Sequence, residues 1–377
     1  MIVELLTGDC MEQIAGLPDE SIHCCVTSPP YWGLRDYGTA TWEGGNPDCD
    51  HAPANTSKPR NARPLGAFHG GTDEGNASRE PDMRTSCHCG ATRIDRQLGL
   101  EESPEEYVAK MVDVFRAVRR VLRDDGTLWL NIGDSYAGSA CGLKDGKGSS
   151  DNNTGRGDAP KFSRIAGEGI KPKDLVGIPW MLAFALRADG WYLRQDIIWH
   201  KPNPMPESVR DRCTKAHEYV FLLSNSQKYF YDYEAIKEDS ISATNNNPPT
   251  KRGSERYASA SGVNGNAQLF TRKNDGTRNK RSVWTVTTKP YPEAHFATFP
   301  PKLIEPCILA GCPVGGTVLD PFSGSGTTGF VAIENGRSYI GVELNPEYQD
   351  LAKKRIAGAQ LPLFAPGIAA PADKETT

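Results

Sequence analysis

A segment near the carboxyl end of the chain places the strongest constraint on its fold. Residues 318–328 read Val-Leu-Asp-Pro-Phe-Ser-Gly-Ser-Gly-Thr-Thr, an apolar strand that ends in an acid and passes through a glycine-rich turn into a helix. A second apolar strand, residues 338–343, also ends in an acid, and this Glu343 lies 17 residues after Gly326. Such a turn brings bare backbone and free N–H groups close to a ligand, and an acid at this spacing reaches ribose hydroxyls. The turn alone is typical of any tight strand-to-helix connection, but turn and acid together indicate a nucleoside-type cofactor.

The remainder of the chain alternates between strand-like and helix-like segments. The clearest helix begins at Ser103, an N-cap residue followed by Pro104 at the first helical position and by Glu106, which completes a capping box. Apolar residues then recur at helical spacing, and Asp124-Asp125-Gly126 is expected to end the helix. This alternation predicts an α/β fold on a doubly wound sheet. We predict strands at 2–6, 21–26, 127–132, 192–199 and 218–223, extended chain at 283–286, and helices at 11–15, 103–122, 179–188, 301–310 and after residue 346.

Three stretches interrupt this alternation. Residues 38–93 have no clear period and are expected to be an insertion, residues 138–174 are rich in small and charged residues and are expected to be mobile, and the chain beyond about 360 is rich in Ala and Pro. No stretch approaches the roughly 20 apolar residues of a membrane span, and the first residues lack the basic start of a secretory signal. Ten cysteines without such a signal indicate reduced thiols in a cytoplasm, or metal ligands.

A second motif lies at the opposite end of the chain. The strand at 21–26 stops at Thr27-Ser28-Pro29-Pro30-Tyr31-Trp32. Two prolines remove two backbone donors and stiffen the chain, so that a Ser hydroxyl and a Pro carbonyl can together hold a primary amine. The ring of Tyr31 offers a flat surface on which an extracted base can stack. Alone, such a run is often a rigid turn, but in ligand-binding sheets chemistry occurs at the carboxyl ends of strands.

The two motifs together resemble those of the amino-group DNA methyltransferases, the N4-cytosine/N6-adenine methylase family. The Pro-Pro-Tyr motif comes first and the glycine-rich loop last, which is similar to the β class of that family. The resemblance covers most of residues 1–358, including the runs at 31–38 and 199–204, and lapses over the two long insertions and the C-terminal tail. It implies a Rossmann-like S-adenosylmethionine-dependent methyltransferase fold with a permuted motif order.

The resemblance also implies a division of the chain. The catalytic half is expected at 1–37 and 94–236, and the cofactor-binding half at 291–358. Residues 237–290 occupy the place of the target-recognition segment, residues 38–93 form the insertion, and residues 359–377 form a flexible tail.

The resemblance assigns roles to residues of both motifs. In the family, a base is rotated out of the DNA duplex and its exocyclic amine attacks the methyl group of S-adenosylmethionine without a covalent enzyme intermediate. The catalytic residues implied are Ser28, Pro29, Pro30 and Tyr31. The cofactor-binding residues implied are Asp9, Lys302, Asp320, Pro321, Phe322, Gly324, Gly326, Thr327, Thr328 and Glu343. Cys24 and Cys25 need no role as nucleophiles and are expected to be buried strand residues.

The resemblance defines the target base and the binding partners less narrowly than the site residues. Ser-Pro-Pro-Tyr is more frequent in N4-cytosine enzymes, which favours cytosine slightly, while N6-adenine stays open. An RNA methyltransferase and a non-catalytic DNA-binding protein of the same fold are the alternatives, whereas a protein-glutamine methylase disagrees with the motif order. The resemblance implies a cytoplasmic enzyme, bacterial or phage-encoded, that acts on double-stranded DNA. A homodimer and a separate cognate restriction endonuclease are compatible with it.

Charge is unevenly distributed along the chain. The formal net charge of −4 argues against indiscriminate binding of nucleic acid. Residues 251–289 nevertheless hold nine Lys or Arg and two acids, which suits either a segment that contacts phosphates or a solvated loop. The DNA-contacting candidates are His200, Lys201, Arg210, Arg212, Arg272, Lys273, Arg278, Lys280 and Arg281.

Two pairs of soft ligands flank the insertion. Cys49 and His51 precede its central part, and Cys87 and Cys89 follow it. Four such ligands match the number in a structural Zn²⁺ site that pins a long loop, although the one-residue gaps are tighter than the usual two to four. Free thiols on a loop are the alternative, and His88 could exchange places with a neighbour in the ligand set.

Overall fold

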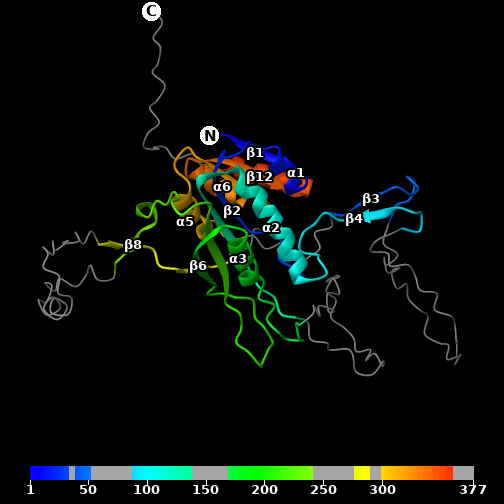
Figure 1. Ribbon diagram of the computed structural model, residues 1–377, viewed down its shortest axis with the longest axis horizontal. Coiled ribbons are helices and arrows are strands. Elements are labelled where there is room, and N and C mark those ends of the chain that lie inside the picture. The colour runs from blue at the N-terminus through cyan, green and yellow to red at the C-terminus, as the bar shows by residue number, and fades with distance from the viewer. Residues whose placement is uncertain (34–38, 52–86, 138–168, 241–275, 289–298, 360–377) are drawn as a thin grey trace, which may run out of the picture. The chain divides into compact units, whose positions relative to one another are not determined.

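The computed structural model describes residues 1–33, 39–51, 87–137, 169–240, 276–288 and 299–359. Its centre is an eight-stranded sheet in the order β1-β12-β11-β2-β5-β7-β6-β10 (Figure 1). The strands are β1 (Val3–Thr7), β2 (Ile22–Thr27), β5 (Leu122–Ile132), β6 (Tyr192–His200), β7 (His217–Ser224), β10 (Val283–Thr285), β11 (Thr317–Asp320) and β12 (Ser338–Glu343). The predicted α/β fold with a doubly wound sheet is therefore confirmed.

The direction of the strands identifies the edge at which ligands bind. Strands β1, β12, β11, β2 and β5 are parallel, and β7 lies antiparallel between β5 and β6. From β11 the chain continues to β12 on one side, whereas from β2 it continues toward β5 on the other side. The neighbouring strands β11 and β2 therefore flank a topological switch point, where open α/β sheets bind ligands beyond the carboxyl ends of the strands.

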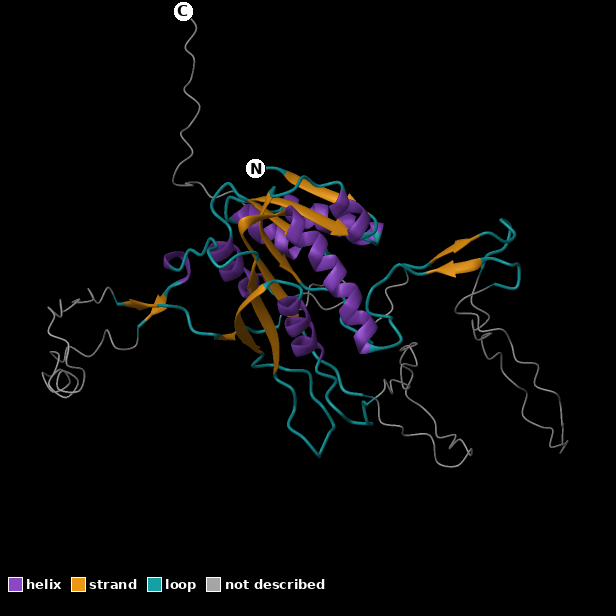
Figure 2. Cartoon of the chain, in the orientation of Figure 1, coloured by secondary structure: helices purple, strands orange, loops and turns teal. Residues whose placement is uncertain are grey.

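Helices cover both faces of the sheet (Figure 2). On one face α5 (Pro301–Gly311), α6 (Thr327–Glu334) and α7 (Pro346–Ala357) pack in sequence, and a continuous apolar cluster fills the space below them. On the other face lie α1 (Cys10–Ala15), α2 (Pro104–Val121) and α3 (Ile178–Ala188). Arg120 of α2 donates to the Ile14 carbonyl of α1 at 2.7 Å, and Arg116 of α2 pairs with Asp189 after α3 at 2.5 Å.

The start of α2 follows the predicted capping pattern, but its end does not. The Ser103 hydroxyl accepts the Glu106 N–H at 3.1 Å, while the Glu106 carboxylate accepts the N–H of Glu102, one residue earlier than a capping box requires. The helix ends at Val121, and β5 begins at once with Leu122. The expectation that Asp124-Asp125-Gly126 ends the helix is therefore wrong, since these residues belong to β5. A register shift between Ile22 and Cys24 of β2 absorbs the extra residues of β5 as a bulge.

The chain divides into two compact units. The first comprises residues 1–29, 108–136 and 175–377 and contains the sheet, and the second comprises 30–107 and 137–174. The second unit holds the antiparallel ribbon of β3 (Thr41–Glu43) and β4 (Thr92–Ile94), which lies within the predicted insertion. In the first unit a short 3₁₀ helix, η1 (Glu234–Ile236), precedes a small ribbon of β8 (Glu238–Asp239) and β9 (Thr277–Arg278). Among the described residues no helix is long and apolar enough to span a bilayer.

Candidate active site

The two sequence motifs meet at the carboxyl edge of neighbouring strands. Strand β2 pairs in parallel with β11, with Cys24 opposite Val318 and Cys25 opposite Leu319. At the ends of these strands the Thr27 hydroxyl donates to the Asp320 carboxylate at 2.5 Å. The residue after Thr27 is Ser28, the first of the predicted catalytic run. A buried side-chain hydrogen bond thus joins segments almost 300 positions apart in the sequence.

Asp320 organises the start of the glycine-rich loop. Its carboxylate accepts hydrogen bonds from Thr27, from the Thr328 hydroxyl at 2.7 Å and from the Phe322 N–H at 3.0 Å. Burial raises the pKa of this carboxyl to about 6, although the three hydrogen bonds oppose the rise. Since all three donors belong to the protein, Asp320 holds the loop in shape. Pro321 is buried and Phe322 half-buried next to it.

Two glycines allow the loop to approach its neighbours. Gly324 and Gly326 have φ of +51° and +75°, in the left-handed region that favours glycine. A Cβ at Gly326, the N-cap of α6, would lie 2.8 Å from the Cβ of Ala352 in α7, so only glycine fits there. Arg355 of α7 donates to the hydroxyl of Thr327 at 2.7 Å. The Thr327 side chain therefore fixes the loop to α7, and its backbone contributes to the first turn of α6.

The acid predicted to hold ribose lies beside the same loop. Glu343 ends β12 and accepts the Gly324 N–H at 2.8 Å and the Asn345 N–H at 2.9 Å. Burial raises its pKa, while these backbone donors lower it. Thr7 of β1 pairs with Glu343, and Asp9 follows two residues later as the N-cap of α1, accepting the Met11 N–H at 2.9 Å. Both predicted acids therefore lie at the carboxyl edge of the sheet.

The second unit opens with Pro30 and Tyr31, and its own contacts hold this part of the loop. The Tyr107 hydroxyl donates to the Pro30 carbonyl at 2.9 Å. The indole of Trp32 is buried and donates to the Glu101 carbonyl at 3.0 Å. Within the first unit, Ser28 is half-buried and Pro29 is buried.

Sequence reasoning missed one acid at the same edge. Asp134 follows β5, the neighbour of β2, and its Oδ1 accepts the N–H groups of Ser135, Gly177 and Ile178 at 2.9–3.2 Å. Its other oxygen lies 3.7 Å from the Lys215 ammonium. Burial lowers the pKa of Lys215, against the attraction of Asp134. The run Gly133-Asp134-Ser135 directly after a buried strand was the available signal.

The predicted DNA-contacting side chains are largely paired within the protein. Lys201 pairs with Glu218, and Arg212 pairs with Glu207 at 2.6 Å while lying 3.7 Å from the Tyr136 ring centre. His200 faces the Thr285 hydroxyl at 3.2 Å. Arg278 and Arg281 both contact Glu238, at 2.9 and 2.6 Å. Lys280 lies over the buried Trp284, Arg210 is exposed, and Arg272 and Lys273 lie outside the described residues.

The remaining predicted residues are Lys302, the four metal ligands and the two cysteines of β2. Lys302 is exposed in the first turn of α5. In the second unit, the ligand atoms of the four predicted metal-binding residues all lie within 4.8 Å of one another: Cys49, His51, Cys87 and Cys89. Cys24 and Cys25 are fully buried in β2, as predicted, and burial raises the pKa of both thiols.

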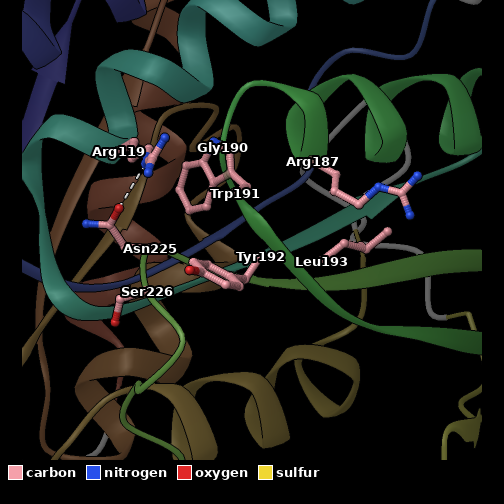
Figure 3. Close-up of a pocket in the computed structure, with 8 residues that line it drawn as sticks. All are labelled: Arg119, Arg187, Gly190, Trp191, Tyr192, Leu193, Asn225 and Ser226. Carbon is pink, nitrogen blue, oxygen red and sulfur yellow. Dashed lines mark hydrogen bonds between the residues drawn. The ribbon is translucent and has the colours of Figure 1, made fainter.

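A surface hollow of about 570 Å³ lies at the opposite edge of the sheet (Figure 3). It forms where Tyr192 begins β6 beside the last residue of β7, the edge at which the parallel strands start. Arg119 lines it and donates to Asn225 at 2.9 Å. Because ligands of open α/β sheets bind at the carboxyl edge, this hollow is separate from the candidate active site.

Comparison with known proteins agrees with this geometry. A family profile described as DNA methylase (N6_N4_Mtase) matches residues 22–354, which include both motifs. The chain belongs to this DNA methylase family. It is therefore a DNA amino-methyltransferase.

Its relatives include enzymes of restriction–modification systems. The chain is 42% identical over 353 residues to the Type II methyltransferase M.SmaI of Serratia marcescens, covering 94% of this chain and 90% of that protein. It is 41% identical over 356 residues to M.Cfr9I of Citrobacter freundii, covering 94% and 87%.

Solved structures share the fold at lower identity. PvuII DNA methyltransferase (cytosine-N4-specific) gives a TM-score of 0.51 at 16% identity, covering 97% of this chain and 87% of the other. A putative DNA modification methylase of Thermus thermophilus, TTHA0409, complexed with S-adenosyl-L-methionine, gives 0.51 at 21% identity, covering 96% of each chain. These similarities confirm the Rossmann-like methyltransferase fold.

Proposed function

We propose that this methyltransferase transfers a methyl group to the N4 amino group of a flipped-out cytosine at the carboxyl edge of β2 and β11. The observation that carries the proposal is the Thr27–Asp320 hydrogen bond, which joins the amine-binding motif to the glycine-rich loop. A stacked base cannot present its amine to a methyl donor in line, so the base must leave the duplex.

Ser28 and Pro29 activate the amine in this proposal. The lone pair of an aromatic amine is delocalised into the ring and is therefore a poor nucleophile. When the Ser28 hydroxyl and the Pro29 carbonyl accept hydrogen bonds from its two N–H groups, the nitrogen becomes pyramidal and its lone pair is directed outward. After methyl transfer the cationic amine loses one proton to solvent. The Pro30 carbonyl already accepts from Tyr107, which leaves the preceding carbonyl for the base. Tyr31 supplies the stacking surface for that base, and positioning supplies most of the rate enhancement.

S-adenosylmethionine is the methyl donor and supplies an electrophilic methyl group when bound. The residues around the loop fit this molecule. The backbone of Gly324 to Thr327 receives its methionine end at the start of α6, Glu343 receives the ribose hydroxyls, and Asp9 lies toward the adenine. Pro321, Phe322 and Thr328 belong to the same glycine-rich motif, and Lys302 of α5 is a further cofactor-binding residue in this proposal.

The choice of cytosine rests on Ser28. A serine in the first position of the motif is more frequent in the N4-cytosine enzymes that the chain resembles, and one solved structure with the same fold is described as cytosine-N4-specific. Residues 237–290 read the DNA sequence, and Arg210 together with the basic residues of that segment contacts phosphates.

The relatives indicate a biological setting. Because M.SmaI and M.Cfr9I are Type II methyltransferases, we infer that this chain is the modification enzyme of a cytoplasmic restriction–modification system with a separate endonuclease. A homodimer is compatible with the β-class resemblance, and light scattering after size-exclusion chromatography would detect it as twice the chain mass of 41.1 kDa.

Product analysis tests the proposed function. The purified protein is incubated with double-stranded DNA of varied sequence and methyl-labelled S-adenosylmethionine, and the digested nucleosides are separated by mass spectrometry. Labelled N4-methylcytosine is the expected product. N6-methyladenine would overturn the choice of base, and label found only on RNA would overturn the choice of nucleic acid. Failure to bind the cofactor would overturn the assignment of the glycine-rich loop.

A further inference from the structure

The second unit contains a cluster of ligands that methyl transfer does not use. The ribbon of β3 and β4, with Trp42 opposite Arg93, brings the chain at 44–51 beside the chain at 87–91. The sulfur atoms of Cys49 and Cys87 are 3.7 Å apart, and the Cys89 sulfur is 3.3 Å from Nδ1 of His51. Four ligand atoms within 4.8 Å of one another enclose a space the size of a single ion.

These separations match tetrahedral zinc. Zinc–sulfur bonds of about 2.3 Å and zinc–nitrogen bonds of about 2.0–2.1 Å place two sulfurs about 3.8 Å apart and a sulfur and a nitrogen about 3.5 Å apart. Three thiolates and one imidazole form a closed set with no position left for water, which is typical of structural zinc sites. We propose that Cys49, His51, Cys87 and Cys89 bind one structural Zn²⁺.

The local backbone is shaped around the cysteines. The Gly90 N–H donates to the Cys87 carbonyl at 2.9 Å, and the Cys87 N–H donates to the Ala91 carbonyl at 2.7 Å, which forms a tight turn. Gly45 has φ of +73°, and a Cβ there would lie 2.7 Å from the Cys89 sulfur. Asn46 and Ala91 donate backbone hydrogen bonds to that sulfur, the kind of contact that stabilises a bound thiolate.

His51, not His88, is the imidazole ligand. The His51 ring is half-buried and stacks on Trp42, with ring centres 5.3 Å apart and planes 27° apart, so its orientation is fixed. His88 is exposed, and its Nδ1 and Nε2 lie 3.6 Å from the Cys87 sulfur and 4.0 Å from the Cys49 sulfur, both farther than the 3.3 Å between His51 and Cys89. A half-buried, oriented ring loses less freedom on binding the ion than an exposed one.

A metal would compensate for a small core. The described buried side chains of the second unit are few, and they include Trp32, Cys87, Ala91 and Tyr107. Units with little apolar surface to bury commonly depend on a metal ion or disulfides. The two ligand pairs flank residues 52–86 in the sequence, so the ion would link the two ends of that segment.

Metal content tests the site independently of methylation. The full-length protein, purified without added metal or chelator, is analysed by plasma mass spectrometry, and one zinc per chain is expected. Cobalt(II) substitution should give the absorption bands of a tetrahedral thiolate site. The Cys49→Ser, Cys89→Ser and His51→Ala variants should each lose the zinc, whereas His88→Ala and Cys213→Ser, a change at an exposed cysteine, should retain it.

Binding of S-adenosylmethionine distinguishes loss of the metal from misfolding of the whole chain. The residues proposed to bind this cofactor lie in the first unit, so binding should persist in all five variants. Wild-type protein without stoichiometric zinc would overturn the proposal, as would a Cys49–Cys87 disulfide in a non-reducing peptide map. Loss of zinc in His88→Ala with retention in His51→Ala would overturn the assigned ligand set.

Discussion

Ser28 contributes one of the two acceptors that this account assigns to the target amine. We predict that Ser28→Ala lowers the methyl-transfer rate by about 10- to 100-fold, since one hydrogen bond that strengthens in the transition state is lost. The dissociation constant of S-adenosylmethionine should not change, because its binding residues lie in other elements. Single-turnover kinetics and calorimetry measure the two quantities.

The matched control is Ser21→Ala. Ser21 lies just before the same strand at its other end, and its hydroxyl donates to the Pro18 carbonyl at 2.7 Å. This change should leave the rate within about twofold of wild type, since it removes one partly exposed hydrogen bond. Equal rate losses in both variants would contradict the role of Ser28.

Asp320 makes a prediction about pH. Its pKa is raised from 3.8 in an ordinary aspartate to about 6, so folding favours the protonated carboxyl, and the stabilisation of the folded state falls as the pH rises from about 4 through 6. Asp320→Asn removes this dependence. The melting temperature of the variant minus that of wild type should therefore become more positive between pH 5 and 7.5. The expected change is roughly 2–4 °C, which corresponds to about 1 kcal/mol of unfolding free energy.

Asp350→Asn serves as the control, because Asp350 is exposed on α7 and pairs only at the surface with Lys353. This surface change should leave the melting temperature close to that of wild type at both pH values. A constant difference for Asp320→Asn as well would show that its pKa is not raised. Cofactor affinity of Asp320→Asn should fall, since the loop loses its charged organiser.

At the residue scale, the sequence predicted which residues belong to the site more reliably than it predicted their contacts. Asp320 and Thr327 stand in the expected motif, yet their side chains bond Thr27, Thr328 and Arg355. Partners so distant in sequence cannot be read from a local pattern. Asp134 had a local signal in its place after a buried strand, but its partner Lys215 belongs to a different segment of the chain and could not be predicted.

Among the elements, the junction of the loop with α6 and α7 has the least tolerance for change. Gly326→Ala would bring a Cβ to 2.8 Å from the Cβ of Ala352 and force a side chain into a left-handed backbone position. We predict at least a tenfold loss of cofactor affinity and a lower melting temperature, with about 1–2 kcal/mol from the backbone alone. Calorimetry and thermal unfolding measure these effects.

The Gly315→Ala variant measures the stability cost of a left-handed backbone position without a steric contact. Gly315 has φ of +79°, but nothing lies within 4 Å of its added Cβ. This variant should lose stability and keep its cofactor affinity. If both variants lose affinity equally, the contact with α7 is not what positions the loop.

Regular elements were predictable where their periodicity was strong. The helix at 301–310 and the strands at 192–199 and 218–223 agree with α5, β6 and β7 to within one residue or two at either end. The short strands β3, β4, β8 and β9 were not predicted, because two or three residues show no alternation. The boundary between α2 and β5 was misplaced, because polar Arg123–Gly126 resemble a turn and a bulge holds them in the sheet.

For the whole molecule, the sequence predicted a doubly wound sheet and the order of its motifs. It did not determine that β7 lies antiparallel between β5 and β6, or that β1 lies beyond β12 at the edge. Strand order depends on which faces pack together, and this information is spread over the whole core. The contact of Thr27 with Asp320 is a consequence of that order, since β2 and β11 are neighbours only in the folded chain.

The most direct test of this account is a crystal structure of the enzyme with S-adenosylmethionine. We predict that the cofactor lies over Gly324–Thr327 with its ribose at Glu343. The methyl group of the cofactor should face the Ser28 hydroxyl and the Pro29 carbonyl. A cofactor bound at the opposite edge of the sheet, or with its methyl group turned away from Ser28, would contradict a single active site built from both motifs.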